Sequence, residues 1–273
     1  MSDLEDLIAL CEIRKGRNLD KYVNHANPQI RKKVAEQGYD LDILVNDESP
    51  IVRIEVAKQG YALDTLINDE EDFIRREVVR QKYGLDVLIY DKHASIRAEV
   101  ASQKYGLDIL IHDEESVVRA AVAEQGYGLD ILVNDESPYV RATVAKQGYA
   151  LETLINDKED MVRIAVAKQN YGLDILIHDE NPYVRAAVAR QGYGLDILIN
   201  DKSMIVREEA AEQGYGLGIL ANDEHRVVRT TADKQVHKAK ISETFEEKLN
   251  RLEKEAEMKN QNINPQRTQS QER

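Results

Sequence analysis

Arginine and aspartate recur in this chain at a fixed spacing of 22 residues, and their chemistry is the first to need an explanation. Each arginine after the first has an aspartate six residues before it, and Arg31 has His25 there. A row of guanidinium groups could bind anions, but like charges one repeat apart repel each other unless they are neutralised. Guanidinium is planar and matches a carboxylate through two hydrogen bonds. We therefore predict a structural Arg–Asp ladder that joins adjacent repeats. Its arginines are Arg53, Arg75, Arg97, Arg119, Arg141, Arg163, Arg185 and Arg207, and its aspartates are Asp47, Asp69, Asp91, Asp113, Asp135, Asp157, Asp179 and Asp201.

Other residues that commonly catalyse reactions or bind metals do not form a recognisable site. None of the six histidines has another histidine four residues away, and the two that replace an asparagine of the repeat, His112 and His178, are three repeats apart. The single cysteine, Cys11, excludes a disulfide within the chain and a cysteine-based zinc or iron–sulfur centre. The chain has no glycine-rich phosphate-binding loop. We therefore expect no enzymatic activity, no cofactor and no metal site.

The helices that must position the ladder can be derived from one repeat, residues 129–150. Ser137–Pro138 predicts a helix start, because serine caps the first N–H groups and proline fits the first helical position. Val140 and Val144 then form an apolar stripe on one face. Gly148 supplies the left-handed residue at which such a helix ends. Other residues replace this glycine in three repeats, so the helix end does not strictly require it. These residues are Lys82, Lys104 and Asn170.

A shorter element precedes this helix within the repeat. Leu129, Leu132 and Val133 have spacings that suit a short α- or 3₁₀-helix. The alternative is a strand like that of leucine-rich repeats, in which apolar residues alternate and an asparagine follows three residues later. Here Asn134 follows Val133 directly. We predict an all-α, right-handed solenoid of ten 22-residue repeats over residues 19–238, each with a helix of about ten residues and a shorter one.

Segments of different composition flank the repeats. Residues 1–18 predict an amphipathic helix that caps the first repeat. Residues 239–259 carry apolar residues close to a heptad spacing, which predicts a helix that either forms a weak homodimer or caps the last repeat. Residues 260–273 are rich in Asn, Gln and Arg, a composition typical of a disordered tail.

The residues Asp135 to Ala145, followed by Leu151 and Leu154, resemble the HEAT-like family of helical repeats, and the short period resembles its leucine-rich repeat variant type. The resemblance covers residues 19–238 and implies a scaffold of alternating α- and 3₁₀-helices. Variant-repeat proteins can carry a cysteine-ligated iron–sulfur cluster ahead of the repeats, but only Cys11 is present here. HEAT-like repeats also occur in phycobilin lyases and some DNA glycosylases, and no residue pattern here matches a lyase site.

The charge of the chain bears on its partners. The formal net charge is −13, and the ten repeats hold 39 acidic against 27 basic residues. Direct nucleic-acid binding is disfavoured, because affinity for phosphate comes from clustered Lys and Arg. No stretch has the pattern of a signal peptide or the length of a membrane span. We therefore expect a cytoplasmic protein with no membrane association.

The positions that vary between repeats suggest where a partner binds. On the long helix, the varying positions lie two residues before the repeated arginine, one or two residues after it, and five residues after it. We expect side chains at these positions to face away from the core. They are mostly charged in the outer repeats and small or apolar in the middle ones. Either this strip binds a protein partner, or its alanines merely favour helix and its tyrosines cover neighbouring surface. A rival function is an acidic mimic of nucleic acid, and a lyase-type enzyme is a third. The predicted partner-binding residues are Tyr139, Ala142, Lys146, Met161, Ile164, Lys168, Tyr183, Ala186 and Arg190.

Overall fold

The computed structural model describes residues 3–241, Leu249 and Glu253, and every regular element in them is a helix. Long helices alternate with helices of four residues, which confirms the predicted α-solenoid and the helical nature of the short element. The long helices are α1 (Asp3–Arg14), α3 (Pro28–Glu36), α5 (Pro50–Lys58), α7 (Asp72–Arg80), α9 (Ala94–Ser102), α11 (Ser116–Glu124), α13 (Pro138–Lys146), α15 (Asp160–Ala167), α17 (Pro182–Arg190) and α19 (Met204–Glu212). The short helices are α2 (Leu19–Tyr22), α4 (Leu41–Leu44), α6 (Leu63–Leu66), α8 (Leu85–Leu88), α10 (Leu107–Leu110), α12 (Leu129–Leu132), α14 (Leu151–Leu154), α16 (Leu173–Leu176), α18 (Leu195–Leu198) and α20 (Leu217–Leu220). Residues 226–241 are also helical.

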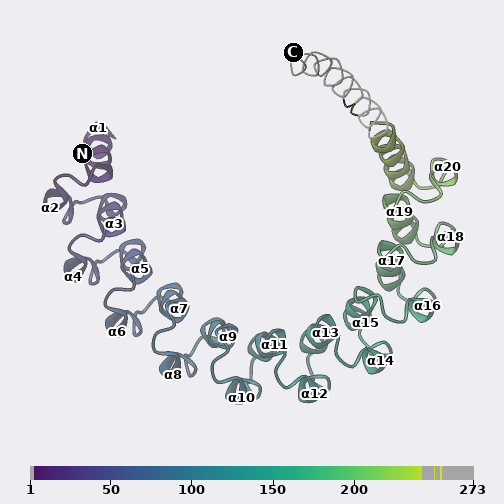
Figure 1. Ribbon diagram of the computed structural model, residues 1–273, viewed down its shortest axis with the longest axis horizontal. Coiled ribbons are helices and arrows are strands. Elements are labelled where there is room, and N and C mark those ends of the chain that lie inside the picture. Colours follow the sequence, from purple (N-terminus) through teal and green to yellow (C-terminus); the bar gives the residue numbers. More distant parts are fainter. Residues whose placement is uncertain (1–2, 242–248, 250–252, 254–273) are drawn as a thin grey trace, which may run out of the picture. The chain divides into compact units, whose positions relative to one another are not determined.

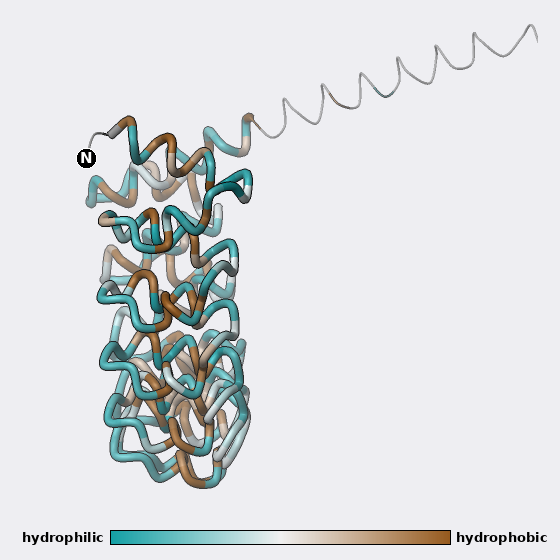
Figure 2. The backbone as a smooth tube through the Cα atoms, turned by 90° about the vertical axis from the view of Figure 1, so that its left-hand side faces the viewer, coloured by the Kyte–Doolittle hydropathy of each residue, from teal (hydrophilic) through white to brown (hydrophobic). Residues whose placement is uncertain are grey.

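The helices form two parallel rows within each of two units, Met1–Leu154 and Ile155–Arg273. In the first unit each long helix lies against the next long helix, and each short helix from α2 to α12 contacts the long helices on either side of it in sequence. The long helices form the inner row of this unit and the short helices the outer row, and α15–α20 of the second unit are arranged likewise (Figure 1). Apolar segments run along the middle of the first unit, with hydrophilic turns on both sides (Figure 2). Val34, Ala35 and Leu44 are typical of its fully buried residues.

The ladder aspartate also organises the start of each long helix. Ser137 has the extended backbone of an N-cap, but its side chain makes no capping hydrogen bond, so the predicted serine cap is wrong. Instead, the backbone N–H of Ser137 donates to Asp135 Oδ1 at 2.8 Å. Asparagine does cap, because Asn181 Oδ1 accepts from the backbone N–H of Tyr183 at 2.8 Å. The helix start therefore depends on the aspartate two residues before the cap, which every repeat after the first contains.

Each long helix in repeats one to nine ends at a left-handed residue, whether or not that residue is glycine. Gly148 has φ +73°, and Lys104 adopts φ +61° at the equivalent position. The left-handed conformation is thus common to these repeats, whereas glycine is not, as the substitutions predict. A second left-handed residue lies two positions later and begins the next short helix, as at Gly106 (φ +58°) and Ala62 (φ +49°).

This second left-handed residue is matched to the side chain at the end of the preceding short helix. A Cβ atom built on Gly106 would lie 2.1 Å from Ile89 Cδ1, which is too close for any real contact. Every glycine at this position lies 17 residues after an isoleucine. The pairs are Ile67–Gly84, Ile89–Gly106, Ile111–Gly128, Ile155–Gly172, Ile177–Gly194 and Ile199–Gly216. Where the residue has a side chain, the partner is the shorter valine, in the pairs Val23–Asp40, Val45–Ala62 and Val133–Ala150. Two combinations of side chains are therefore compatible at this contact: isoleucine with glycine, and valine with a residue that has a Cβ.

The array changes at both ends. Helix α1 contacts α2 and α3 and buries Ala9 and Ile13 against them, while Leu4 and Leu7 are exposed. In residues 226–241, the exposed Asp233 occupies the position where earlier long helices bury an alanine or valine that faces the next repeat. Of the predicted C-terminal helix, 239–259, only residues 239–241, Leu249 and Glu253 are described, and the predicted tail, 260–273, lies outside the described residues. The handedness of the coil stays a prediction.

The helices also bear on the expected lack of membrane association. Among the described residues, no helix combines the length and the apolar character needed to cross a bilayer.

Candidate functional site

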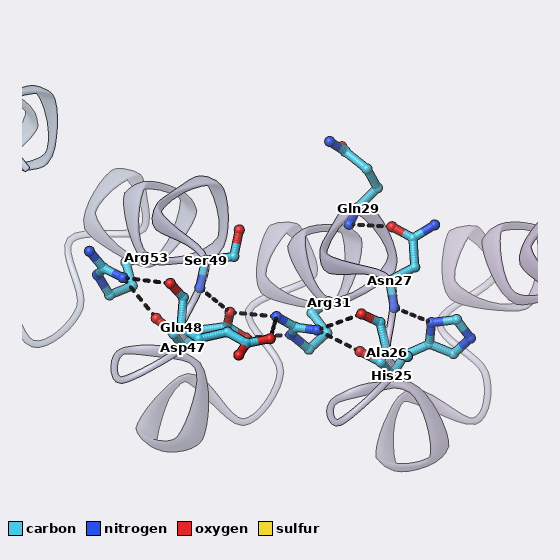
Figure 3. A network of polar contacts seen from close by, with 9 residues as sticks. All are labelled: His25, Ala26, Asn27, Gln29, Arg31, Asp47, Glu48, Ser49 and Arg53. Carbon is cyan, nitrogen blue, oxygen red and sulfur yellow. Dashed lines mark hydrogen bonds and ion pairs between the residues drawn. The ribbon is translucent and has the colours of Figure 1, made fainter.

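The arginines and aspartates come together as a ladder between neighbouring repeats. Arg97 donates from Nε to Asp113 Oδ2 at 2.6 Å and from Nη2 to Asp113 Oδ1 at 2.8 Å. Its Nη1 donates to the backbone carbonyl of Asp91, the aspartate of its own repeat, at 2.8 Å. Figure 3 shows the same arrangement at Arg31. The paired residues are Arg31–Asp47, Arg53–Asp69, Arg75–Asp91, Arg97–Asp113, Arg119–Asp135, Arg163–Asp179, Arg185–Asp201 and Arg207–Asp223. Arg141 binds the backbone carbonyls of Asp135 and Glu136 through Nη1.

The ladder is buried and its charges neutralise each other. The side chains of Arg119 and Asp135 are only 10% and 6% exposed. The hydrogen bond to Asp135 raises the pKa of Arg119, although burial opposes this. Burial raises the pKa of Asp113, but hydrogen bonds from Arg97 and from the backbone N–H of Glu115 outweigh it and lower that pKa below its ordinary value. All three nitrogens of each such guanidinium are engaged, so this geometry favours a structural role over a row of anion sites.

The first step of the ladder explains the histidine in the first repeat. The position one repeat before Arg31 is Ala9, so no arginine is present to pair with an aspartate at position 25. His25 instead accepts the backbone N–H of Asn27 through Nδ1 at 3.1 Å, which reproduces the turn that the aspartate makes elsewhere. At the other end, Arg229 donates through Nη1 to the carbonyls of Asp223 and Glu224, and no carboxylate within the described residues pairs with it.

The predicted partner-binding residues divide into exposed and buried sets. Tyr139 and Tyr183 are 41% and 57% exposed, and Met161 is 39% exposed. Lys146, Lys168 and Arg190 are exposed as well. Ala142 and Ala186, however, are only 2% and 4% exposed, so the prediction that they belong to an exposed strip is wrong. Ile164 is half-buried. Neighbouring long helices contact each other directly, and a short alanine side chain does not reach beyond that contact.

The exposed members of the predicted strip already interact with their own chain. In the first unit, the Lys146 ammonium lies 5.8 Å from the centre of the Tyr139 ring, which is a cation–π distance. In the second unit, Arg190 pairs with Glu209 through Nε at 3.0 Å and through Nη2. These contacts restrain the side chains of Tyr139, Lys146 and Arg190, which reduces the entropy that they would lose on binding a partner.

The glutamine and tyrosine that recur in each repeat also have defined contacts. We predict from the sequence that the glutamines bond free backbone groups at the helix end. Their backbone N–H groups do so, as in Gln103 to Val100 O at 3.0 Å. Where a glutamine side chain bonds within the described residues, however, its acceptor is a glutamate, as in Gln235 to Glu212. The recurring tyrosines are about 40% exposed, and Tyr61 donates to Asp42, in the short helix of the same repeat, at 2.5 Å.

Tyr90 is a surface residue that the sequence reasoning missed. Its side chain is 70% exposed, more than any other large apolar or aromatic side chain in the described part of the chain. It stands where most repeats have asparagine, and it is followed after one residue by Lys92, where most repeats have glutamate. Its departure from the repeat is the signal that identifies it in the sequence, and it lies in a turn rather than on the long helices that carry the predicted strip.

Clefts recur between the turns of adjacent repeats, and two of them border Tyr90. Their volumes are about 350 Å³ on the side of Asn68 and about 450 Å³ on the side of His112. No group of three or more His, Cys, Asp or Glu residues in residues 3–241 is placed to hold a metal ion. The clefts therefore offer apolar and charged side chains rather than a metal centre.

The comparisons with known proteins add no family to this description. No protein-family model matches the chain, and no curated protein matches it either. The functional interpretation therefore rests on the helical repeat array, its neutralised ladder and the side chains exposed around it.

Proposed function

We propose that this protein is a non-enzymatic scaffold that binds a partner protein through exposed side chains of its middle repeats. The support for this is a regular helical solenoid, an architecture that usually presents an extended surface to other molecules. The observation that carries the proposal is the exposure of Tyr139 and Tyr183 at a position that the fold leaves free to vary. Exposed aromatic side chains with basic neighbours are typical of protein-binding surfaces.

The proposal also covers the repeat family and the cellular location of the protein. The alternation of a nine-residue helix with a four-residue helix fits the leucine-rich repeat variant type of HEAT-like repeats. A cytoplasmic setting fits a chain with one cysteine, which is exposed and has no disulfide partner in the chain. Weak self-association through residues 239–259 is a separate hypothesis, which measurement of the mass in solution would test.

The burial of the alanines refines this surface. Ala142 and Ala186 pack between helices, so the expected contacts come from the side chains that project beyond them. These are Tyr139 and Lys146 in the first unit, and Met161, Lys168, Tyr183 and Arg190 in the second. The two sets are proposed independently, and either one is sufficient to bind a partner.

A second candidate function is mimicry of nucleic acid by a row of carboxylates. The residue after the ladder aspartate is a highly exposed glutamate in several repeats, for example Glu48 at 87% and Glu136 at 88%. Such a row could occupy the basic site of a nucleic-acid-binding protein. Because exposed charges are screened by salt, this kind of complex should weaken steeply as ionic strength rises, whereas an apolar contact should not.

The test is affinity capture from the native host with the wild-type chain and with a Tyr139→Ala/Tyr183→Ala variant. We expect the double variant to fold and to lose the partner, because truncating an aromatic anchor at an interface costs on the order of 2 kcal/mol or more. Surface truncations elsewhere change stability by about 0.5 kcal/mol or less. If the variant folds and still captures the same partner, the proposed surface is wrong. Capture that disappears in high salt for the wild type would favour the acidic mimic.

Arg141→Ala provides the structural contrast. Its Nη1 binds the carbonyls of Asp135 and Glu136 at 2.8 and 3.1 Å, and both would lose that partner. Buried acceptors left without a donor cost about 1–3 kcal/mol. We therefore expect Arg141→Ala to lower the urea midpoint of unfolding and the tyrosine variant to leave it nearly unchanged. The two outcomes separate residues that are only two positions apart in the chain.

A further inference from the structure

The turns that follow the short helices carry a repeated sequence, and one of them has a tyrosine at its first position. Most repeats read Asn–Asp–Glu or Asn–Asp–Lys, whereas the turn after α8 reads Tyr90–Asp91–Lys92. Because Asp91 is buried in the ladder with Arg75, the exposed residues of this turn are Tyr90 and Lys92. The two neighbouring turns present Glu70 and Glu114, which are 83% and 85% exposed. Along the first unit the exposed charges therefore run negative, positive, negative.

Lys92 differs from the glutamates of the neighbouring turns because it has no partner of opposite charge within the described residues. Glu70 lies 3.6 Å from Arg53 Nη2, and Glu114 lies 3.9 Å from Arg97 Nη2. Lys92 makes no ion pair with any residue that the structure describes. The fold does not require a lysine there, because Glu48, Glu70 and Glu114 occupy the same position in other repeats. A free cation beside a highly exposed tyrosine is a combination found in binding sites rather than in a structural turn.

Tyr90 borders two open clefts that are lined by both apolar and charged side chains. Val87 and Leu88 line the cleft toward the preceding repeat, and Ile109 and Leu110 line the cleft toward the following repeat. Both clefts also include Tyr90 and Lys92. A ligand that spans both clefts would therefore place one apolar group on each side of the Tyr90 ring and an acidic group near Lys92.

The spacing of the repeats indicates the conformation of such a ligand. A single guanidinium bridges successive turns, as Arg75 does between the carbonyl of Asp69 and the carboxylate of Asp91. The long helices beside these turns pack at about 8–10 Å, so we take the charges of successive turns to lie at about this interval. A polyproline II helix advances about 9.3 Å in each three-residue turn and has no internal hydrogen bonds to break. Its first, fourth and seventh residues lie on one ridge and can face three successive turns. Its second and fifth residues lie on the adjacent ridge, between those charges, where the two clefts are.

We propose that Tyr90 and its two clefts bind a polyproline II segment of a partner protein with the pattern basic–apolar–x–acidic–apolar–x–basic. The basic residues face Glu70 and Glu114, the acidic residue faces Lys92, and the apolar side chains enter the clefts on either side of Tyr90. Aromatic side chains beside a groove suit this kind of ligand, because its backbone is already extended and loses little entropy on binding. The site is made of other residues than the surface proposed above, so either can fail without the other.

The experiment measures fluorescence anisotropy of the labelled peptide Lys-Leu-Pro-Glu-Leu-Pro-Lys with the full chain. A second peptide, Lys-Leu-Pro-Lys-Leu-Pro-Lys, changes only the central charge. Tyr90→Asn and Lys92→Glu restore residues that other repeats carry at these positions, so both variants should fold. Circular dichroism and the urea midpoint confirm that they do. Lys202→Glu is the matched control, because it makes the same substitution in a turn that has asparagine instead of tyrosine.

We expect Tyr90→Asn to weaken binding of the first peptide at least tenfold. Lys92→Glu should shift the ratio of the two peptides' affinities at least tenfold toward the peptide with central lysine. Comparing the two affinities as a ratio corrects for the general electrostatic attraction between a basic peptide and an acidic protein. Lys202→Glu should leave both affinities unchanged. The proposal is overturned if the wild-type chain does not bind the first peptide, if Tyr90→Asn binds it equally well, or if Lys92→Glu and Lys202→Glu have the same effect.

Discussion

Replacing Gly106 by alanine tests whether the junction between repeats depends on matched side chains. The new Cβ would lie 2.1 Å from Ile89 Cδ1 and 3.5 Å from Ile89 Cγ1, at the end of the preceding short helix. Position 106 also has φ +58°, a conformation that a residue with a Cβ adopts with strain. The variant thus introduces a steric overlap and backbone strain together. Ile89→Val removes the overlap alone, since it deletes the overlapping methyl group.

The expected magnitudes follow from these two effects. Left-handed backbone costs roughly 1–2 kcal/mol for a residue with a Cβ, and overpacking a filled site costs typically about 1–3 kcal/mol. Gly106→Ala should therefore destabilise the array by about 2–5 kcal/mol. Ile89→Val alone should cost about 0.5–1.5 kcal/mol, because it leaves a small cavity. In the double variant the new Cβ fills that cavity, so only the backbone strain of about 1–2 kcal/mol should persist.

The assay is urea unfolding of the four proteins, followed by circular dichroism at constant protein concentration. Midpoints should be compared only where the slopes agree, because repeat arrays can unfold in parts. We expect Ile89→Val to rescue Gly106→Ala, with a coupling of about 1.5–4.5 kcal/mol, because the double variant loses both the steric overlap and the cavity. If Gly106→Ala is equally destabilising with isoleucine and with valine at position 89, the steric explanation of the pairing is refuted and backbone strain accounts for the whole effect.

Two further outcomes can be measured with the same method. Lys104→Gly should stabilise the array by about 0.5–1 kcal/mol, because Lys104 has φ +61° and glycine adopts this conformation without strain; a lower urea midpoint would contradict this. The pKa values of Asp91, Asp113 and Asp201 are lowered, since the hydrogen bonds that each receives from its ladder arginine and a backbone N–H outweigh burial. A carboxyl whose folded pKa is depressed stabilises the fold above its unfolded pKa of about 3.9 and loses this as pH falls through the folded value. Stability should therefore be level from about pH 6 to 5 and fall below about pH 4, and a urea midpoint unchanged down to pH 3 would argue against the ladder's contribution.

The fold could be predicted from the sequence because its signals repeat in each unit and agree with one another. The apolar spacing of Val140 and Val144, the proline at Pro138 and the left-handed position at Gly148 each mark one part of the long helix. A ladder of arginine and aspartate between adjacent repeats could be inferred from charge alone, since unneutralised guanidinium groups would repel. That the aspartate comes from the later repeat needed the structure. What made this possible is that every contact in the ladder links residues at a constant separation.

The predictions that failed concern features that residue spacing does not determine. These are the burial of a short side chain between helices and the choice between two side chains that could bond the same helix start. The helical period places Ala142 and Ala186 on the outward side, but the closeness of the neighbouring helices decides whether so short a side chain reaches solvent. Ser137 could have capped its helix, but the carboxylate of Asp135 reaches its backbone N–H and fixes the turn. Tyr90 could have been found from the sequence, because it is a large departure from the repeat. Its exposure and its two clefts needed the structure.

The matched pairs also predict which repeat can be removed from the chain without a steric penalty. Residues 45–72 and 133–160 are nearly identical, so the valine of each Val–Ala pair and its alanine are copies of one combination. Deleting residues 46–67 removes one repeat, restores the ladder and places Val45 opposite Gly84, which leaves only a small gap. Deleting residues 112–133 also removes one repeat and restores the ladder, but places Ile111 opposite Ala150. The second deletion should be less stable by roughly 1–3 kcal/mol, the penalty of overpacking, and Ala150→Gly should restore most of this difference. Equal urea midpoints for the two deletions would show that isoleucine is tolerated opposite alanine. The pairing seen in the sequence would then reflect only duplication of the repeats.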